Sequence, residues 1–265
     1  MLPETGGFES IKRTCGLEAA GPRLHLNMIV KDEGSILDRA LFSVAPHIES
    51  WTIVDTGSSD NTLDVAHNSL RQLPGKSFQR PWVNFAHNRN EAMELAHTYF
   101  DFDYLLTIDA DEFLEMPKFL GSEHDVLSTL VHHQGKVGLR PLLIRRGYPG
   151  RWQGRIHEDL SFEGSWGLLD GSKVCSYNDG ARAKRPDKHN QDLMLLFEEI
   201  AEHPNDPRWY YYLGATYMAA GDYEQAKKAF NIQLLYPEGS ALERHEAQES
   251  LKFIGIMEKT CATSL

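Results

Sequence analysis

The sequence predicts an α/β protein with a C-terminal helical module, and three observations predict it. Between residues 24 and 108, short apolar runs typical of strands alternate with amphipathic helical patterns, and this succession favours a mostly parallel sheet covered on both faces. Between residues 136 and 177 the patterns are those of strands. From about residue 188 the apolar spacing is helical to the end.

Turn-forming and capping residues mark where the elements of the first half begin and end. Ser35 is a plausible cap for a helical pattern that Pro46 stops, and Asp60 or Asn61 can cap the next helix. Because successive strands run parallel, the polar loops that follow them gather along one edge of the sheet. The predicted strands are 24–30, 51–54, 76–78 and 104–108, and the predicted helices are 36–44, 62–70 and 85–96.

The strand over 104–108 ends in the acidic run DADE at 109–112. Alternate side chains of an extended chain point the same way, so Asp109 and Asp111 can address one metal ion or one nucleotide. The run DFD at 101–103 has the same spacing at the other end of this strand, and we interpret it as a solvated loop. Ligands of open α/β sheets bind beyond the carboxyl ends of strands, which favours the later pair over a plain solvated strand end.

The second half contains strand patterns and then one helical repeat. Residues 206–239 match one tetratricopeptide-type unit of about 34 residues. Because one unit cannot bury its own apolar face, the helical patterns over 193–201 and 242–257 are expected to pack against it. The expected strands of this half are 136–144, 151–156 and 173–177, and they would face the nucleotide edge as an acceptor side.

Composition and cysteine usage are those of an ordinary globular protein. With 265 residues, 41% of them hydrophobic, the chain can bury a sizeable core. No apolar run approaches the roughly 18 residues of a membrane span, and no export signal is recognisable at the N-terminus. Cys15, Cys175 and Cys261 are expected to be free thiols in a reducing compartment, which favours a cytoplasmic location. The LPETGG run at 2–7 is interpreted as chance or a cloning remnant.

The net charge of −11 argues against broad, non-specific binding of nucleic acid, yet the basic residues are grouped. Residues 126–157 contain no Asp or Glu, and a second basic group follows at 182–188. Two interpretations stay open, namely a solvated basic face and a site for phosphates or an anionic acceptor. The basic residues are Lys136, Arg140, Arg145, Arg146, Arg151 and Arg155 in the first group, and Arg182, Lys184, Arg185 and Lys188 in the second.

Five short motifs occur in a characteristic order: NMIVKDE, IVDTGSSDNT, FAHNRNEAMELA, TIDADE and RIHE. With them the chain resembles the inverting glycosyltransferases of family 2, and in particular the bacterial members with C-terminal tetratricopeptide helices. The resemblance implies the GT-A fold, whose sheet is Rossmann-like and mixed. The resemblance implies a lead-in over 1–22, a glycosyltransferase domain over 23–187 and a helical module over 188–265. The domain would divide into a nucleotide half, 23–112, and an acceptor half, 113–187.

The resemblance also implies roles for residues of the first half. Val30, Lys31 and Glu33 would line the nucleoside pocket, Asp55 would bind the base or ribose, and Arg89 would help to hold the nucleotide. Asp109 would lie by the ribose or metal, and Asp111 would bind Mg²⁺ or Mn²⁺, hard cations suited to carboxylate and phosphate oxygens. Each residue also has a structural interpretation: Glu33 can favour a helix start, Asp55 can be a turn residue, and Arg89 can lie on a helix surface.

The run RIHED at 155–159 supplies candidates for the base that accepts the proton of the attacking acceptor group. Glu158 is the first choice and Asp159 the second, because strand alternation puts them on opposite faces. His157 is a candidate third metal ligand or diphosphate contact, and its alternative is a structural histidine. The sequence departs from the family pattern in three places. Thr56 replaces a second acidic residue, the Gln-x-x-Arg-Trp motif is absent, and the run VCSYN at 174–178 contains no histidine.

The sequence therefore predicts a metal-dependent inverting glycosyltransferase of the hexosyltransferase type. It would transfer one sugar from a nucleotide-sugar donor, most simply a UDP-sugar, to a hydroxyl of a saccharide, lipid or protein. Rival hypotheses are glycosylation of modified bases in DNA, a non-catalytic tetratricopeptide adaptor, and nucleotidyl transfer on a related sheet.

Overall fold

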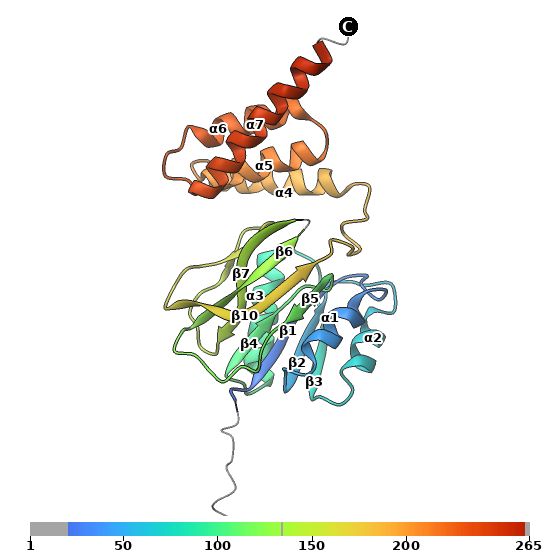
Figure 1. Ribbon diagram of the computed structural model, residues 1–265. Coiled ribbons are helices and arrows are strands. Elements are labelled where there is room, and N and C mark those ends of the chain that lie inside the picture. The colour runs from blue at the N-terminus through green and yellow to red at the C-terminus, as the bar shows by residue number, and fades with distance from the viewer. Residues whose placement is uncertain (1–20, 134, 263–265) are drawn as a thin grey trace, which may run out of the picture.

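The computed structural model describes residues 21–133 and 135–262, so Cys15 and the LPETGG run lie outside the described residues. An eight-stranded mixed sheet forms the α/β part, with the strand order β3-β2-β1-β4-β7-β6-β10-β5, and a separate two-stranded ribbon pairs β8 with β9. Four helices follow as a C-terminal module stacked at one end of this sheet (Figure 1). The predicted fold class, a Rossmann-like mixed sheet with a C-terminal helical module, is confirmed in this arrangement.

The elements of the first half are close to those expected from the sequence. They are β1 (Leu24–Val30), α1 (Leu37–Val44), β2 (Ser50–Asp55), α2 (Thr62–Ser69), β3 (Gly75–Gln79), α3 (Phe85–Tyr99) and β4 (Tyr104–Thr107). Parallel pairing of β1 with β2 and β4 aligns Val30 with Asp55 and Asn27 with Thr107. The carboxyl ends of these strands therefore meet at one edge, as predicted.

Two apolar layers cover the two faces of the sheet. The first packs α1 and α2 against side chains such as Leu26, Met28 and Leu106. The second packs α3 against Leu105, Ile144 and the ribbon residue Trp152. Strands β1 and β2 are almost wholly buried, and this includes their polar residues. The ring nitrogens of His25 in β1, for example, are hydrogen-bonded to the hydroxyls of Ser50 and Thr52 in β2.

Two predicted helix caps differ in detail. Helix α1 begins at Leu37 with Ile36 in the cap position, so Ser35 does not cap it. Asn61 occupies the cap position of α2 without a capping side-chain bond; instead, the Asp60 carboxylate accepts from the Thr62 backbone N–H and hydroxyl.

The second half has more strands than the sequence predicts. Its strands are β5 (Glu112–Glu115), β6 (Val126–His133), β7 (Lys136–Arg145), β8 (Trp152–Gln153), β9 (Asp159–Leu160) and β10 (Trp166–Ser176). The predicted strand over 151–156 is wrong beyond Gln153, because Gly154 takes a positive φ of 95° and the chain leaves the ribbon. The strands β5, β6 and β9 were not expected, since β5 and β9 are too short to show a period.

The C-terminal module consists of α4 (Lys188–Glu202), α5 (Pro207–Ala219), α6 (Tyr223–Leu234) and α7 (Ala241–Ala262). Helices α5 and α6 form the two-helix unit predicted at 206–239, with a turn at Gly221. One apolar cluster joins α4 and α5, and a second joins α5, α6 and α7. The flanking helices therefore cover the unit on both sides, as the repeat argument requires.

We predict opposite effects for two glycine substitutions in this module. A Cβ at Gly214 would lie 2.5 Å from the ring of Phe230, so Gly214→Ala overpacks the α5–α6 contact and should destabilise the protein by about 1–3 kcal/mol. Gly255 of α7 has nothing within 4 Å of such a Cβ, and Gly255→Ala should stabilise by about 0.5–1 kcal/mol. Urea denaturation followed by circular dichroism measures both, and equal effects would contradict this packing.

Candidate active site

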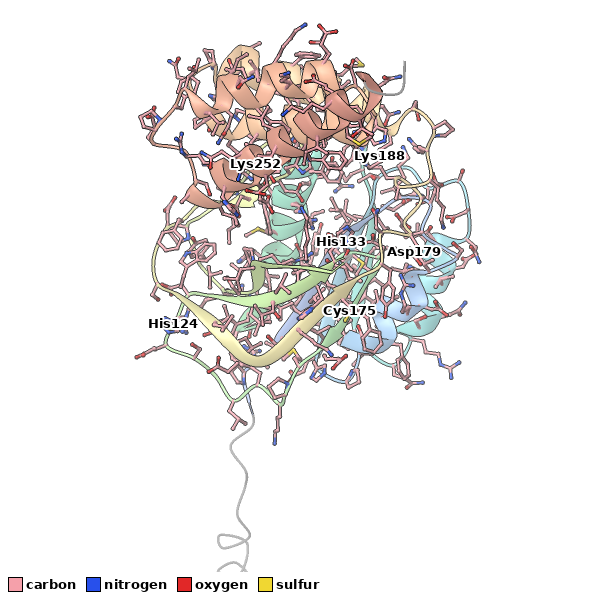
Figure 2. All side chains as sticks on the ribbon, turned by 45° about the horizontal axis from the view of Figure 1, so that its top comes forward. His124, His133, Cys175, Asp179, Lys188 and Lys252 are labelled. Atoms are coloured by element: carbon pink, nitrogen blue, oxygen red, sulfur yellow. The ribbon has the colours of Figure 1, made fainter. Side chains whose placement is uncertain are left out.

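A cavity of about 700 Å³ lies where the carboxyl edge of the sheet meets the helical module. Its floor comes from the ends of β1 and β4, and α3 and the 154–158 loop form one side. The connection from β10 to α4 forms the other side; Figure 2 shows Asp179 on this connection and Lys188 where α4 begins. The chain thus converges on one pocket from both of its halves.

Most of the predicted site residues line this cavity. Those that do are Val30, Lys31, Glu33, Arg89, Asp109, Asp111, His157 and Glu158. Two predicted residues, Asp55 and Asp159, are not part of the lining. Asp55 is buried at the end of β2, where Oδ1 accepts from the N–H and hydroxyl of Ser58 while Oδ2 has no hydrogen-bond partner. Asp159 is exposed, and its carboxylate accepts from the N–H of Leu160.

Arg89 links the two acidic motifs of the sequence. Its Nη2 donates to Asp109 Oδ1 at 2.7 Å, and its Nε donates to Glu158 Oε1 at 2.6 Å. The guanidinium lies 5.2 Å from the ring centre of Trp152 and is only 10% exposed. Arg89 is therefore no surface residue of α3; it fixes the separation of Asp109 and Glu158, which are far apart in the sequence.

Arg140 is the second cation that pairs with Asp109. Its Nη1 donates to both oxygens of Glu112 at 2.7 and 2.8 Å and to Asp109 Oδ2 at 3.2 Å, and its Nη2 donates to the Thr107 carbonyl. Burial alone would raise the pKa of Asp109, but the charges of Arg89 and Arg140 outweigh it and hold that pKa well below its usual range. Burial raises the pKa of Glu112 despite its pairing with Arg140.

Asp111 differs from Asp109 because no ion pair of the described residues involves it. Burial raises its pKa, and the negative charge of Asp109 adds to the effect. Burial also raises the pKa of the neighbouring Glu33, although Glu33 accepts from the backbone N–H of Ala181. A divalent cation would relieve this accumulation of negative charge, so the chemistry of the site fits such an ion.

The described residues do not form a complete metal site from protein side chains alone. Within residues 21–133 and 135–262, no three His, Cys, Asp or Glu side chains are close enough to hold a metal ion together. The predicted set of Asp109, Asp111 and His157 is therefore not assembled as three ligands. Both oxygens of Asp109 are engaged by arginines, which leaves Asp111 as the carboxylate available to a cation whose other ligands would be phosphate and water oxygens.

Three asparagines, one just before the FAHNRNEAMELA motif and two within it, fix the first turns of α3, which carry Arg89. Asn84 caps α3 by accepting from the N–H of His87. Asn88 holds the preceding loop by accepting from Val83 and donating to the carbonyl of Pro81. Asn90 bonds both backbone groups of Trp152 and so fixes ribbon β8 to the helix.

His157 lies in the cavity lining with a left-handed φ of 52°. The strand alternation expected for this run does not hold, because β8 has already ended at Gln153. The imidazole stacks on Tyr212 with ring centres 4.0 Å apart and planes within 7°. Glu158, and not Asp159, therefore faces the cavity, and its side chain is 12% exposed.

The two basic groups of the sequence have different surroundings in the structure. Each basic residue of the first group pairs with a carboxylate, so that stretch is largely structural. The second group instead supplies Arg182, Arg185 and Lys188 to the cavity. Asp192, which is 2% exposed, holds two of these cations, Arg182 and Lys188. The candidate phosphate site is therefore the second group.

Sequence reasoning missed parts of the cavity that come from loops and from α4. The rings of Trp82 and Phe85 meet edge to face with their centres 4.8 Å apart, and both residues line the cavity. Gly180 lies so close to Glu33 that a Cβ would come within 3.1 Å of its carboxylate. Arg39 fixes this connection through a bidentate pair with Asp179. Only the small-residue run around Gly180 hinted at such a close approach.

Known proteins that are similar to this chain include a repeat protein and a glycosyltransferase. No family model matches the chain. A TPR repeat-containing protein of Synechococcus elongatus is 27% identical over 80% of this chain and 56% of its own length. An uncharacterized glycosyltransferase of Rickettsia felis is 32% identical over 36% of this chain and 30% of its own length. The chain thus spans about half the length, or less, of these curated relatives.

Two solved structures are similar to the chain at TM-scores below 0.5. Residues 1–349 of S. aureus TarS, bound to UDP-GlcNAc, give a TM-score of 0.48 at 12% identity, covering 90% of this chain and 92% of that one. The mannosyltransferase PcManGT of Pyrobaculum calidifontis, with GDP-Man and Mn²⁺, gives 0.46 at 13% identity, covering 89% and 81%.

The length and polarity of the helices decide whether one of them could span a membrane. In the part of the chain that the structure describes, every helix is too short or too polar to cross a bilayer.

We predict that neutral replacement of Arg140 lowers the stability of the protein far more than neutral replacement of Arg151. Arg140→Met leaves Glu112 buried without its cation and Asp109 with Arg89 as its single cation, and should cost about 3–5 kcal/mol of stability. Arg151→Met removes a pair with Glu94 in which both side chains are more than half exposed, and should cost less than about 1 kcal/mol. Thermal and urea denaturation measure the difference; similar losses would mean that the Arg140 network contributes little to folding.

Proposed function

We propose that this protein is a metal-dependent inverting glycosyltransferase of family 2 with the GT-A fold. It would transfer one hexose from a nucleotide-sugar donor, a UDP-sugar in the simplest case, to an acceptor hydroxyl. The observation that carries the proposal is the cavity at the carboxyl edge of the sheet, where Asp111, the Arg89 network and three cations of the second basic group meet. The similar proteins that are glycosyltransferases support the same reaction class.

The nucleoside would lie over the ends of β1 and β2. Val30 and Lys31 line the cavity there, and Thr56 borders it after β2. Asp55 would serve the base or ribose through Oδ2, the buried oxygen without a partner, because a ligand N–H or O–H would satisfy it. Such a contact requires a small opening of the Asp55–Ser58 turn, since Asp55 is 1% exposed.

The diphosphate would lie between Asp111 and the cations Arg182, Arg185 and Lys188. Bound Mn²⁺ or Mg²⁺ would neutralise charge that develops on the leaving phosphate oxygen. The three side chains supply positive charge from the opposite wall, and His157 would add a neutral hydrogen-bond donor. Asp109, held by two arginines, would orient the ribose or a water ligand of the ion.

Glu158 is the proposed base. The acceptor O–H attacks the anomeric carbon, a C–O bond forms, the bond to the diphosphate oxygen breaks on the opposite side, and the proton passes to Glu158. Inversion at the sugar follows from this single displacement. Asp159 is not proposed for this role, because it lies outside the cavity lining.

The acceptor would be a saccharide, a lipid head or a protein side chain. DNA glycosylation is less well supported, because the first basic group is paired with carboxylates and offers no row of cations to a phosphate backbone. A purely adaptor function does not account for the buried charges around Arg89.

We predict slow, Mn²⁺-dependent release of UDP from one member of a UDP-sugar panel. Asp111→Asn should lower this rate at least about 100-fold, because the carboxylate is needed for the ion that stabilises the leaving group. The matched control is Asp101→Asn, in the run with the same spacing at the opposite strand end, and it should keep wild-type activity. Release of pyrophosphate from nucleoside triphosphates would instead indicate nucleotidyl transfer.

We predict that Arg185→Gln weakens UDP binding about 5- to 10-fold, because one charge-assisted contact to the diphosphate is lost. Uridine, which lacks phosphates, should bind the variant and the wild type equally. Arg146→Gln, distant from the cavity and paired with Asp101, is the control. Calorimetry measures all affinities, and an equal loss for uridine would remove Arg185 from the phosphate site.

A further inference from the structure

The loop over residues 154–158, named here the base loop, is folded onto the helical module more than onto the sheet. Ile156 is 3% exposed and belongs to the apolar cluster of Leu196, Trp209 and Leu213, which are residues of α4 and α5. A Cβ at Gly154 would lie 2.8 Å from the Trp209 ring. The loop backbone therefore lies directly against the indole, at a position where glycine is required both for space and for its φ of 95°.

Polar contacts to the module fix the same loop. The backbone N–H of Arg155 donates to Glu199 Oε1, and Glu199 is 3% exposed. The carbonyl of His157 accepts from Arg208 Nη2, while its ring stacks on Tyr212. The α/β domain contributes a hydrogen bond from the N–H of Phe85 to the Arg155 carbonyl, and the Arg89 pair with Glu158.

We infer that the helical module is a working part of the active site, because it positions the base Glu158 through the base loop. This rests on the proposed function and adds positioning residues to it: Glu199, Trp209 and Tyr212 act on the reaction without touching substrate. The base loop has more of its contacts with the helical module than with the α/β domain. Arg89 aims the Glu158 carboxylate, but the backbone that carries it takes its shape from α4 and α5.

Helix α4 also orients two cations of the cavity. Its residue Asp192 is buried and pairs with Arg182 and Lys188, both of which line the cavity. The module thus holds both the base loop and two cations of the same pocket. A small displacement of the module would shift the base and the phosphate-binding cations together, and a displacement near 1 Å can slow a reaction about 100-fold.

The test compares two pairs of variants in the full chain, with sugar transfer or UDP release as the activity. Glu199→Ala removes the acceptor of the loop N–H, and Glu202→Ala removes an exposed carboxylate that pairs with the same Arg155. We expect kcat to fall about 10- to 100-fold in the first and less than about 2-fold in the second, with donor KM unchanged in both. Glu199→Gln should restore most of kcat, since its amide oxygen can accept the bond.

The second pair of variants replaces uncharged side chains, so no buried charge is removed. Tyr212→Leu removes the ring under His157, whereas Tyr210→Leu removes a neighbouring ring that stacks on Tyr236 instead. We expect only Tyr212→Leu to lower kcat, with similar melting temperatures. Equal kcat within each pair, or losses confined to donor KM, would overturn the inference.

Hydrogen exchange separates this inference from the proposed function. The amides of 154–158 should exchange faster in Glu199→Ala and Tyr212→Leu than in their matched controls, whether or not the protein turns over a sugar nucleotide. A wild-type protein that neither binds nor cleaves any sugar nucleotide would overturn the proposed function. Unchanged exchange at the base loop would overturn the positioning by the module.

Discussion

The site depends on one constraint: four carboxylates and two arginines share a mostly buried space at the carboxyl edge of the sheet. Arg89 connects Asp109 to Glu158, and Arg140 connects Asp109 to Glu112. Burying this many charges is tolerable only when each is paired, and removing one partner leaves another uncompensated. Asp111 is the exception, since it has no such partner among the described residues. The unpaired carboxylate is therefore the point at which a cation would complete the network.

Much of this arrangement could be predicted from the sequence. Apolar runs and capping residues placed β1 to β4 and the helices between them within a few residues, because buried parallel strands and amphipathic helices leave strong patterns. The edge of the sheet followed from topology, and with it the meeting of Glu33, Asp109 and Asp111. The place of Arg89 was expected only from the family resemblance. The choice between Glu158 and Asp159 did not follow, because it depends on where β8 ends, and Gly154 ends it early.

Other features depend on contacts that no local pattern reveals. Each Lys and Arg in 126–157 pairs with a carboxylate distant in the chain, such as Glu94 for Arg151 and Glu246 for Lys136. The contribution of α4 to the cavity, through Lys188 and Asp192, required knowing how the module docks. Helix α4 lines the pocket, so the helices do not simply extend the sheet domain. The module as a whole lies above the strand ends (Figure 1).

The central claim is that the cavity binds a nucleoside diphosphate together with a divalent ion. Isothermal titration of UDP into the wild-type protein, with and without Mn²⁺, tests it most directly. The account predicts saturable heat at one site per chain, with affinity at least about 10-fold higher when Mn²⁺ is present, a difference of roughly 1.4 kcal/mol. No heat with UDP, GDP or their sugar conjugates at millimolar concentration, in the presence of either Mn²⁺ or Mg²⁺, would contradict it.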